Sequence, residues 1–347
     1  MTLPIEQRIA LIFVKLVMSV LWFFDYVVLA PRKILFKQTV LVLLISSYFL
    51  TASLILYFNA EIKQFIDGIS KLDSLYLLDQ KALIPRKENV FPVLINNNPV
   101  PYVTASSIIE ADKKNDKILF SLREDEQMAP ASTTKLMTAL VAFDLYEMED
   151  VLEIPAYCSD LDGMKAWLPV GKKFAAKDLL SSSLVGSSAD AACALANGKV
   201  PSGDFVPLMN EKARDIGMNN TNFTNAIGFD SIDGLHHSTA KDLYTLSVYA
   251  MKNSFINEVV GIKQYEINSL DGSFSTNLYS TNSLLWEIPE TVGIKTGTTE
   301  AAGEVLIYEY STDDVDLVIV VMGSSNRFKD TKNLLDWVLN SYKWDYF

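Results

Sequence analysis

Residues 129–138 have the sequence Ala-Pro-Ala-Ser-Thr-Thr-Lys-Leu-Met-Thr, and the rest of the chain is organised around them. A turn of small residues leads here into an apolar segment, a pattern that indicates a buried helix. Ser132 stands where this helix begins, and Lys135 follows three positions later on the same face. An amine held against a hydroxyl can serve as the base for a nucleophile. The spacing also fits a helix-capping serine with a solvated lysine, and Ser238 and Lys241 repeat it.

Composition limits the class of protein. The chain has 347 residues, of which 49% are hydrophobic, enough for a sizeable core in one large domain or two modest ones. A formal net charge of −12 argues against a nucleic-acid partner. The only histidines are His236 and His237, so a serine–histidine–acid triad or a histidine-ligated metal site would have to use that pair. Cys158 and Cys193 have no metal-binding spacing and allow at most one disulfide; we expect Cys193, in an apolar run, to be a buried thiol.

The N-terminal part of the chain has the composition of a membrane anchor. Residues 39–58 form an uncharged stretch of 20 residues, the length that crosses a bilayer. Basic residues precede it and acidic residues follow it, so we expect the segment after it to be extracytoplasmic, on the outer face of the cell membrane. We interpret it as an uncleaved transmembrane helix, since the apolar region of a cleaved signal peptide is usually shorter. Residues 1–38 would be cytoplasmic or interfacial, or would hold a first membrane span over residues 9–30.

The remainder divides into a connecting segment and a folded domain. Residues 59–102 combine a helical pattern with a linker rich in proline and asparagine, and the folded domain is expected over residues 103–347. Extended runs around residues 106–121 predict a hairpin, and the patterns further along predict helices and then strands. These are helices over 176–195 with a break at 186–188, over 205–216, from a Ser238 cap to 251 and over 330–342, and strands over 293–298, 303–311 and 315–323. Strands at both ends with helices between them imply a mixed α/β (α+β) domain with a helical insertion in its sheet.

Two further signals accompany the serine and lysine. Lys295, Thr296 and Gly297 lie in a predicted strand, where the lysine supplies positive charge, the hydroxyl can bind a carboxylate and the glycine admits a second backbone. Ser187 lies in the helix break about 55 residues after Ser132. Each signal alone is weak, since Lys-Thr-Gly also occurs at ordinary strand ends. In this order, however, the three form the set that is typical of penicillin-recognising enzymes.

On these residues, the chain from about residue 103 to 347 resembles the serine D-alanyl-D-alanine carboxypeptidases, the low-molecular-mass penicillin-binding proteins. The segments that carry the resemblance are residues 128–138, 221–230, 238–243, 293–303 and 327–331. The resemblance implies a transpeptidase fold like that of β-lactamases, with an antiparallel sheet, flanking helices and a helical subdomain. It implies a membrane-anchored hydrolase that removes the terminal D-Ala of peptidoglycan stem peptides (D-Ala-D-Ala) through an acyl-enzyme. It also implies covalent inhibition by β-lactams, and neither a metal nor another cofactor.

The resemblance assigns the reacting groups. Ser132 would be the acylated nucleophile, and Lys135 would accept its proton in the neutral form. Burial and the charge of Lys295 would both lower the pKa of Lys135. Ser187 would bridge the two lysines and relay a proton to the leaving amine.

The same resemblance assigns the substrate contacts. Lys295 and Thr296, in the strand that continues through Gly297, would hold the terminal carboxylate, and Arg327 would be a second anchor. The backbone N–H groups of Ser132 and Thr298 would form the oxyanion hole.

One position departs from the family pattern. The second motif is Ser-x-Asn in the family, but here it is Ser187-Ser188-Ala189, so the amide that would contact the substrate peptide and orient a lysine is missing. This leaves an alternative function open, a catalytically weak peptidoglycan-binding or scaffold protein. A β-lactamase is a second alternative, but the sequence contains no Glu-x-x-Leu-Asn stretch for a deacylating water. The preferred acceptor, water or an amine, and the oligomeric state are not determined by the sequence.

Overall fold

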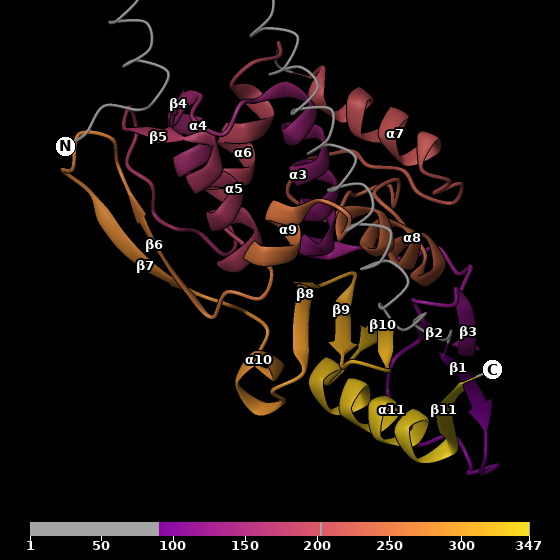
Figure 1. The fold of residues 1–347 in the computed structure, drawn as a ribbon. Coiled ribbons are helices and arrows are strands. Elements are labelled where there is room, and N and C mark those ends of the chain that lie inside the picture. Colours follow the sequence, from indigo (N-terminus) through magenta and orange to yellow (C-terminus); the bar gives the residue numbers. More distant parts are fainter. Residues whose placement is uncertain (1–89, 202, 347) are drawn as a thin grey trace, which may run out of the picture. The chain divides into compact units, whose positions relative to one another are not determined.

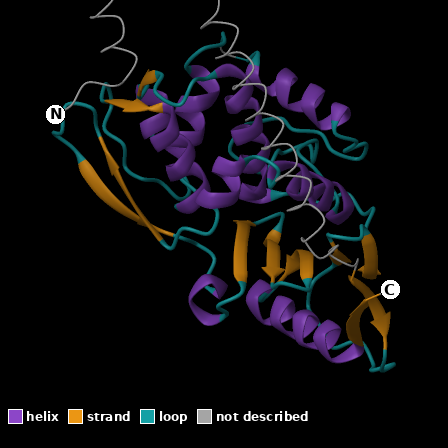
Figure 2. Ribbon diagram, in the orientation of Figure 1, coloured by secondary structure: helices purple, strands orange, loops and turns teal. Residues whose placement is uncertain are grey.

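The computed structural model describes residues 90–201 and 203–346, and the chain from Glu88 to Phe347 forms one compact unit (Figures 1 and 2). The predictions for residues 1–38, for the membrane span at 39–58 and for the juxtamembrane helix lie outside the described residues. Within the described ranges, no helix has the length and apolar character needed to cross a membrane.

A five-stranded antiparallel sheet forms the centre of the unit. Its strand order is β3 (Lys117–Leu122), β2 (Ser107–Asp112), β10 (Asp316–Ser324), β9 (Gly303–Ser311) and β8 (Thr291–Thr299). The predicted sheet, which joins the two ends of the domain, is therefore confirmed. β8 is an edge strand, so one side of it remains open to further backbone pairing.

Both faces of the sheet are covered, and the side-chain alternation of β10 shows how. Val318, Val320 and Met322 pack in the larger core with the helices α3 (Thr134–Leu145) and α8 (Ala240–Ala250). The residues between them, Leu317, Ile319 and Val321, pack in a second cluster with α11 (Arg327–Ser341). In Figure 1 α11 accordingly lies on one side of the sheet and α3 and α8 on the other. Each buried side chain of this kind contributes roughly 1.5–3 kcal/mol.

The helical insertion lies between β3 and β8 in the sequence, as predicted. Its main elements are the turn η1 (Ala131–Thr133), α3, α5 (Ala176–Val185), α6 (Ala189–Asn197) and α7 (Phe205–Asp215), followed by α8. The shorter elements are α4 (Ala156–Ser159), α9 (Ser254–Val259), α10 (Leu284–Glu287), the pair β4 (Val151–Glu153) and β5 (Lys173–Ala175), and the hairpin β6 (Gln264–Asn268) and β7 (Ser275–Tyr279). Residues 134–142 of α3 are all buried, so this helix is the axis of the insertion.

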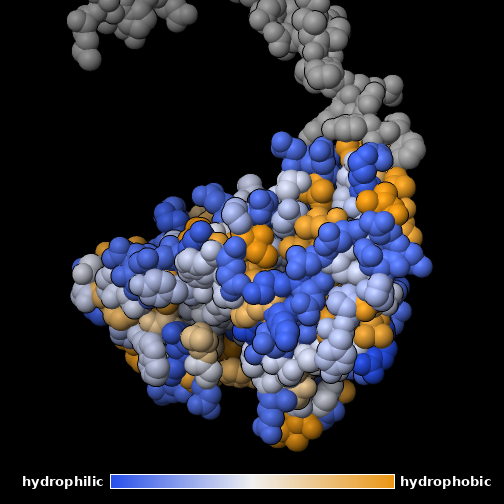
Figure 3. All heavy atoms as spheres, turned by 90° about the horizontal axis from the view of Figure 1, so that it is seen from below, coloured by the Kyte–Doolittle hydropathy of each residue, from blue (hydrophilic) through white to orange (hydrophobic). Residues whose placement is uncertain are grey.

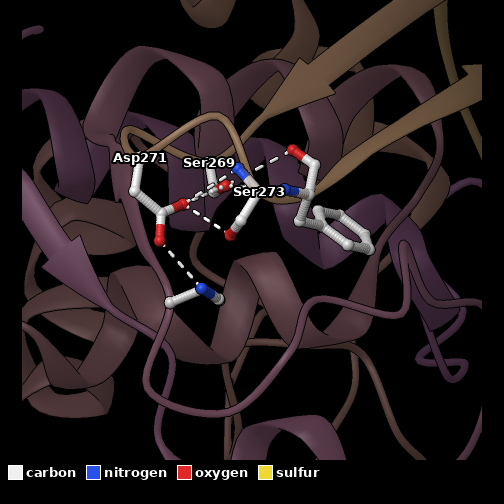
Figure 4. A network of polar contacts seen from close by, with 5 residues as sticks. Ser269, Asp271 and Ser273 are labelled. Atoms are coloured by element: carbon white, nitrogen blue, oxygen red, sulfur yellow. Dashed lines mark hydrogen bonds and ion pairs between the residues drawn. The ribbon is translucent and has the colours of Figure 1, made fainter.

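The sequence did not predict the β6–β7 hairpin, and its tip is fixed by polar contacts. Asp271 accepts hydrogen bonds from Ser269 Oγ and Ser273 Oγ, both at 2.7 Å, and pairs with Lys172 Nζ at 2.8 Å (Figure 4). These bonds hold the pKa of Asp271 well below its usual value. They tie the hairpin tip to the loop before β5. A surface hollow of about 530 Å³ at this tip is lined by Val170 and Leu270 and contains none of the predicted site residues.

A short strand extends the unit beyond the expected boundary at residue 103. β1 (Val90–Leu94) falls in the stretch where a linker was expected, but it pairs with β11 (Tyr342–Tyr346) in an antiparallel two-stranded sheet. The residues that follow are bound to the end of α11, where Asn98 Nδ2 donates to Asn340 O at 3.2 Å. The linker prediction is corrected here, because the strand partner lies about 250 residues away and leaves no local signal.

Two local predictions are corrected as well. Cys158 and Cys193 form a disulfide, so Cys193 is not a free thiol. The bond forms because α4 and α6 pack together and bring the two Cα atoms to 5.5 Å. The cap of α8 is Thr239, whose side chain accepts from Asp242 N, and not Ser238. Ser238 Oγ instead lies 2.8 Å from Thr221 Oγ1.

Figure 3 shows one face of the unit in space-filling form. Hydrophilic residues dominate this face, and apolar residues form separate patches on it.

Candidate active site

The predicted nucleophile lies in a tightly enclosed turn. Ser132 is in η1, directly before α3, and Ala131 has the left-handed φ of 50°. Two glycines make room for this turn. A Cβ atom on Gly228 would lie 2.0 Å from Ala131 O, and one on Gly297 would lie 2.8 Å from Ser132 N. The backbone that lies close to Gly297 in the structure is the nucleophile turn itself, whereas the sequence analysis expected an extended peptide there.

Lys135 contacts the hydroxyl of Ser132. Its Nζ donates to Ser132 Oγ at 2.8 Å and to Ile227 O at 2.8 Å, and its side chain is 1% exposed. Burial lowers the pKa of Lys135 to about 7, while the negative charge of Asp190 opposes this shift. A large share of this amine is therefore neutral near pH 7 and can accept a proton.

Lys295 and Ser187 form a second buried pair. Lys295 Nζ donates to Ser187 Oγ at 2.8 Å and to Thr296 O at 3.1 Å. The pKa of Lys295 is well below its usual value, first because of burial and then because of the positive charges of Lys135 and Arg327. The sequence analysis expected burial and the charge of Lys295 to lower the pKa of Lys135. Burial does lower it, but the repulsion between the two lysines lowers the pKa of Lys295. Among the described hydrogen bonds Ser187 joins one lysine, not both.

The helix break that carries Ser187 is shaped by its surroundings. Ser187 has a left-handed φ of 55° between α5 and α6. Ala189, where the family has asparagine, is 1% exposed and packs in an apolar cluster with the disulfide and Ile227. Its backbone N–H donates to Met164 O at 2.8 Å. The position is filled by apolar packing, so no amide reaches the lysine from here.

The open edge of β8 holds the predicted substrate contacts. Thr298 is exposed, whereas Thr296 is buried and its hydroxyl bonds to that of Thr281. Arg327, at the start of α11, donates from Nη1 to Gly297 O at 2.8 Å and to Thr298 Oγ1. Its Nε is buried and has no partner within the described part of the chain. The guanidinium and the Thr298 hydroxyl therefore lie together beside the strand, in a position suited to a carboxylate.

The histidines take no part in this arrangement. His236 Nδ1 accepts from Thr224 N at 3.0 Å, so its Nε2 carries the proton and faces Thr134 Oγ1 at 3.0 Å. Burial lowers the pKa of His236 to about 4, which leaves the ring neutral. No group of acidic, histidine and cysteine side chains suited to a metal ion occurs in the ranges that the structure describes. The site is thus built on serine and lysine.

The sequence analysis did not predict two residues of the site, Asp190 and Ile227. Asp190 is fully buried, accepts from Ala166 N at 3.1 Å and Leu168 N at 3.0 Å, and opposes the shift of Lys135. Ile227 acts through its carbonyl, which no side-chain motif can signal. The position of Asp190 three residues after Ser187 was the one available clue to it.

Known proteins resemble this chain in sequence and in fold. A model of the D-alanyl-D-alanine carboxypeptidase family, peptidase S11, matches residues 95–326. The chain belongs to this family. D-alanyl-D-alanine carboxypeptidase DacF of Bacillus subtilis is 28% identical over 249 residues, which are 69% of this chain and 63% of DacF. D-alanyl-D-alanine carboxypeptidase DacA of Haemophilus influenzae is 30% identical over 256 residues, which are 68% of this chain and 62% of DacA. The chain thus spans less than two thirds of the length of these two carboxypeptidases.

Solved structures of the carboxypeptidase family share the fold. The Streptomyces K15 DD-transpeptidase is 26% identical with a TM-score of 0.66, over 70% of this chain and 100% of that one. A D-alanyl-D-alanine carboxypeptidase from Mycobacterium tuberculosis is 26% identical with a TM-score of 0.65, over 71% and 95%. The penicillin-binding-like fold that the resemblance implied is therefore confirmed.

Proposed function

We propose that this chain is a serine D-alanyl-D-alanine carboxypeptidase that removes the terminal D-Ala of peptidoglycan stem peptides. The observation that carries the proposal is the 2.8 Å hydrogen bond between Lys135 Nζ and Ser132 Oγ, made by a lysine that is 1% exposed. A buried amine with a pKa of about 7, held against a hydroxyl, is a general base next to its nucleophile. The family membership supports the same reaction.

Acylation begins at Ser132. Neutral Lys135 accepts the hydroxyl proton while Oγ forms a bond to the carbonyl carbon of the penultimate D-Ala. The carbonyl oxygen becomes negative and is stabilised by the N–H groups of Ser132 and Thr298, each donor contributing roughly 3 kcal/mol. Ser132 lies at the start of a helical turn, where backbone N–H groups lack partners within the helix.

The leaving group departs in the next step. The carbon–nitrogen bond breaks as the carbonyl re-forms, and the D-Ala nitrogen takes up a proton through the Ser187 hydroxyl, which Lys295 holds at 2.8 Å. The proton that Lys135 took from Ser132 replaces the one given to the amine, so Lys135 is neutral again. Water then gives a proton to Lys135 and forms a bond to the acyl carbon. The bond between that carbon and Ser132 Oγ breaks, and Oγ takes the proton back from Lys135. An amine in place of water would give a transpeptidase.

Substrate charge completes the site. Burial disfavours a proton on Lys295, but the terminal carboxylate of the substrate would favour one. Binding therefore leaves Lys295 charged and Lys135 neutral, with Arg327 as a second cation near the carboxylate. Each lysine then has the charge that its role requires.

The test is a reaction of the full chain, in detergent, with a fluorescent penicillin. We expect a stable adduct that intact mass and peptide mapping place on Ser132, and none in Ser132→Ala. D-Ala release from an acetylated Lys-D-Ala-D-Ala peptide would then establish turnover. A folded protein that binds the peptide without forming an adduct would favour the binding or scaffold function, which the buried Ala189 supports. Rapid hydrolysis of the penicillin would favour the β-lactamase.

We also propose that residues 39–58 anchor the enzyme in the cell membrane with the site on the outer face. The support is their uncharged, 20-residue composition and the basic residues before them. After extraction of cell membranes with alkaline carbonate, the full chain should remain in the pellet. Loss of residues 39–58 should release it, and an unchanged pellet would contradict the proposal.

A further inference from the structure

We propose that Asn225 is a positioning residue for the general base: its side chain fixes the loop of residues 225–229, whose Ile227 carbonyl orients Lys135 toward Ser132. The inference rests on the proposed function, since it concerns the same lysine.

The side chain of Asn225 closes this loop on itself. Its Oδ1 accepts three hydrogen bonds from consecutive backbone N–H groups, those of Ile227 at 3.1 Å, Gly228 at 2.7 Å and Phe229 at 3.1 Å. Its Nδ2 donates to Phe229 O at 2.9 Å. The amide thus uses both ends within five residues, which leaves the loop little freedom to rotate the Ile227 peptide.

The closed loop contacts the catalytic helix at successive points. Ile227 O accepts from Lys135 Nζ at 2.8 Å, and Ala226 O accepts from Thr138 Oγ1 at 2.6 Å. Gly228, with a φ of 94°, lies so close to the nucleophile turn that a Cβ atom there would overlap Ala131 O. The loop therefore sets the position of the base and also that of the turn that carries the nucleophile.

Lys135 needs such a partner because of its chemistry. A neutral amine has two N–H groups and one lone pair, and it rotates freely about its last bond. When one N–H is given to Ile227 O, the rotation stops and the lone pair can face the hydroxyl of Ser132. The apolar Ala189 offers no amide for this purpose. The Ile227 carbonyl is accordingly the fixed acceptor that directs the base.

Asn210 provides a matched control. Its side chain also hydrogen-bonds to backbone just before the loop of residues 225–229. Its Oδ1 accepts from Phe223 N at 2.7 Å, and its Nδ2 donates to Phe223 O at 2.8 Å. Its bonds do not reach Lys135. Loss of Asn210 should therefore lower stability without changing the base.

The experiment measures the second-order acylation rate of the full chain by a fluorescent penicillin from pH 5 to 10, with the thermal midpoint of each variant. Asn225→Ala should acylate about 100-fold more slowly, the loss that a misplaced catalytic group typically causes. In the plot of acylation rate against pH, the midpoint on the acid side should also move to higher pH. A loosened loop admits water to the buried Lys135, which favours its protonated form. Asn225→Ser, which keeps an uncharged acceptor oxygen, should restore some of the rate. Asn210→Ala should lower the thermal midpoint alone.

The outcomes separate the two proposals. The inference is overturned if folded Asn225→Ala and Asn225→Ser have the same acylation rate as Asn210→Ala and the same pH dependence of that rate. The role of Asn225 would then be only structural. If the unaltered chain forms no adduct at any pH, the proposed function itself is overturned.

Discussion

Replacement of Lys135 by methionine should slow acylation strongly and at the same time stabilise the fold. The side chains have similar length, but methionine carries no amine. General-base catalysis contributes typically 10²–10⁴-fold. The acylation rate of Lys135→Met should fall by about that factor at pH 8.

The stability effect follows from the pKa. Burial lowers the pKa of Lys135 from the ordinary 10.5 to about 7, so between these values the unfolded chain binds a proton that the folded chain does not. The folded state is therefore penalised in full below about pH 7, and the penalty fades as pH rises toward 10.5. At about 1.4 kcal/mol per pH unit it amounts to about 5 kcal/mol at neutral pH. The carbonyl of Ile227 would lose its donor in the variant, at a cost of about 1–3 kcal/mol.

The expected net gain for Lys135→Met at pH 7 is roughly 2–4 kcal/mol, or roughly 5–10 °C in the thermal midpoint. Denaturant unfolding at pH 7, 8, 9 and 10 measures it. The advantage of the variant should shrink by about 1.4 kcal/mol at each step. Lys241→Met is the control, because Lys241 also follows a serine by three residues but its side chain is half exposed. A stability difference for Lys135→Met that did not change with pH would refute the reasoning.

Three further results are expected. Gly228→Ala should reduce penicillin acylation more than 100-fold, because its Cβ would overlap Ala131 O, whereas Gly217→Ala, with nothing within 4 Å, should change only the unfolding midpoint. Replacement of Cys158 and Cys193 by alanine should cost about 2–4 kcal/mol in denaturant unfolding, since the disulfide closes a loop of 35 residues; a loss below 1 kcal/mol would contradict this. His236 should destabilise the fold as pH falls from 6.5 toward 4, because only the unfolded chain then takes up its proton. His236→Gln should flatten that region of the stability profile.

The sequence predicted the elements whose patterns are local. The β-branched run of β10, the break at Ser187 and the spacing of Ser132 and Lys135 each depend on neighbouring residues. The order of the three motifs then linked these pieces to one site. These predictions needed no knowledge of tertiary packing.

Features that depend on contacts between segments far apart in the sequence could not be predicted in this way. The pairing of β1 with β11 joins the two ends of the unit, and the bond between Cys158 and Cys193 depends on the packing of two helices. The Ile227 carbonyl has no side-chain signature at all. The cause of the Lys135 shift was predicted only incompletely, because the burial of each lysine depends on the finished fold.

The pairing of β1 with β11 also has a mechanical meaning. Val90, the first residue of β1, lies opposite Tyr346, the penultimate residue of the chain. A pull that enters through the chain before Val90 first meets this residue pair and the hydrogen bond that Asn115 Nδ2 donates to Val90 O at 2.9 Å. Side chains join this pair of strands to the five-stranded sheet, since Lys117 Nζ of β3 donates to Pro92 O at 3.0 Å and Trp344 Nε1 donates to Asp112 Oδ2 of β2 at 2.6 Å. Tension from the N-terminal side therefore reaches β3 and β2, which lie at the opposite end of the five-stranded sheet from β8 and its Lys295.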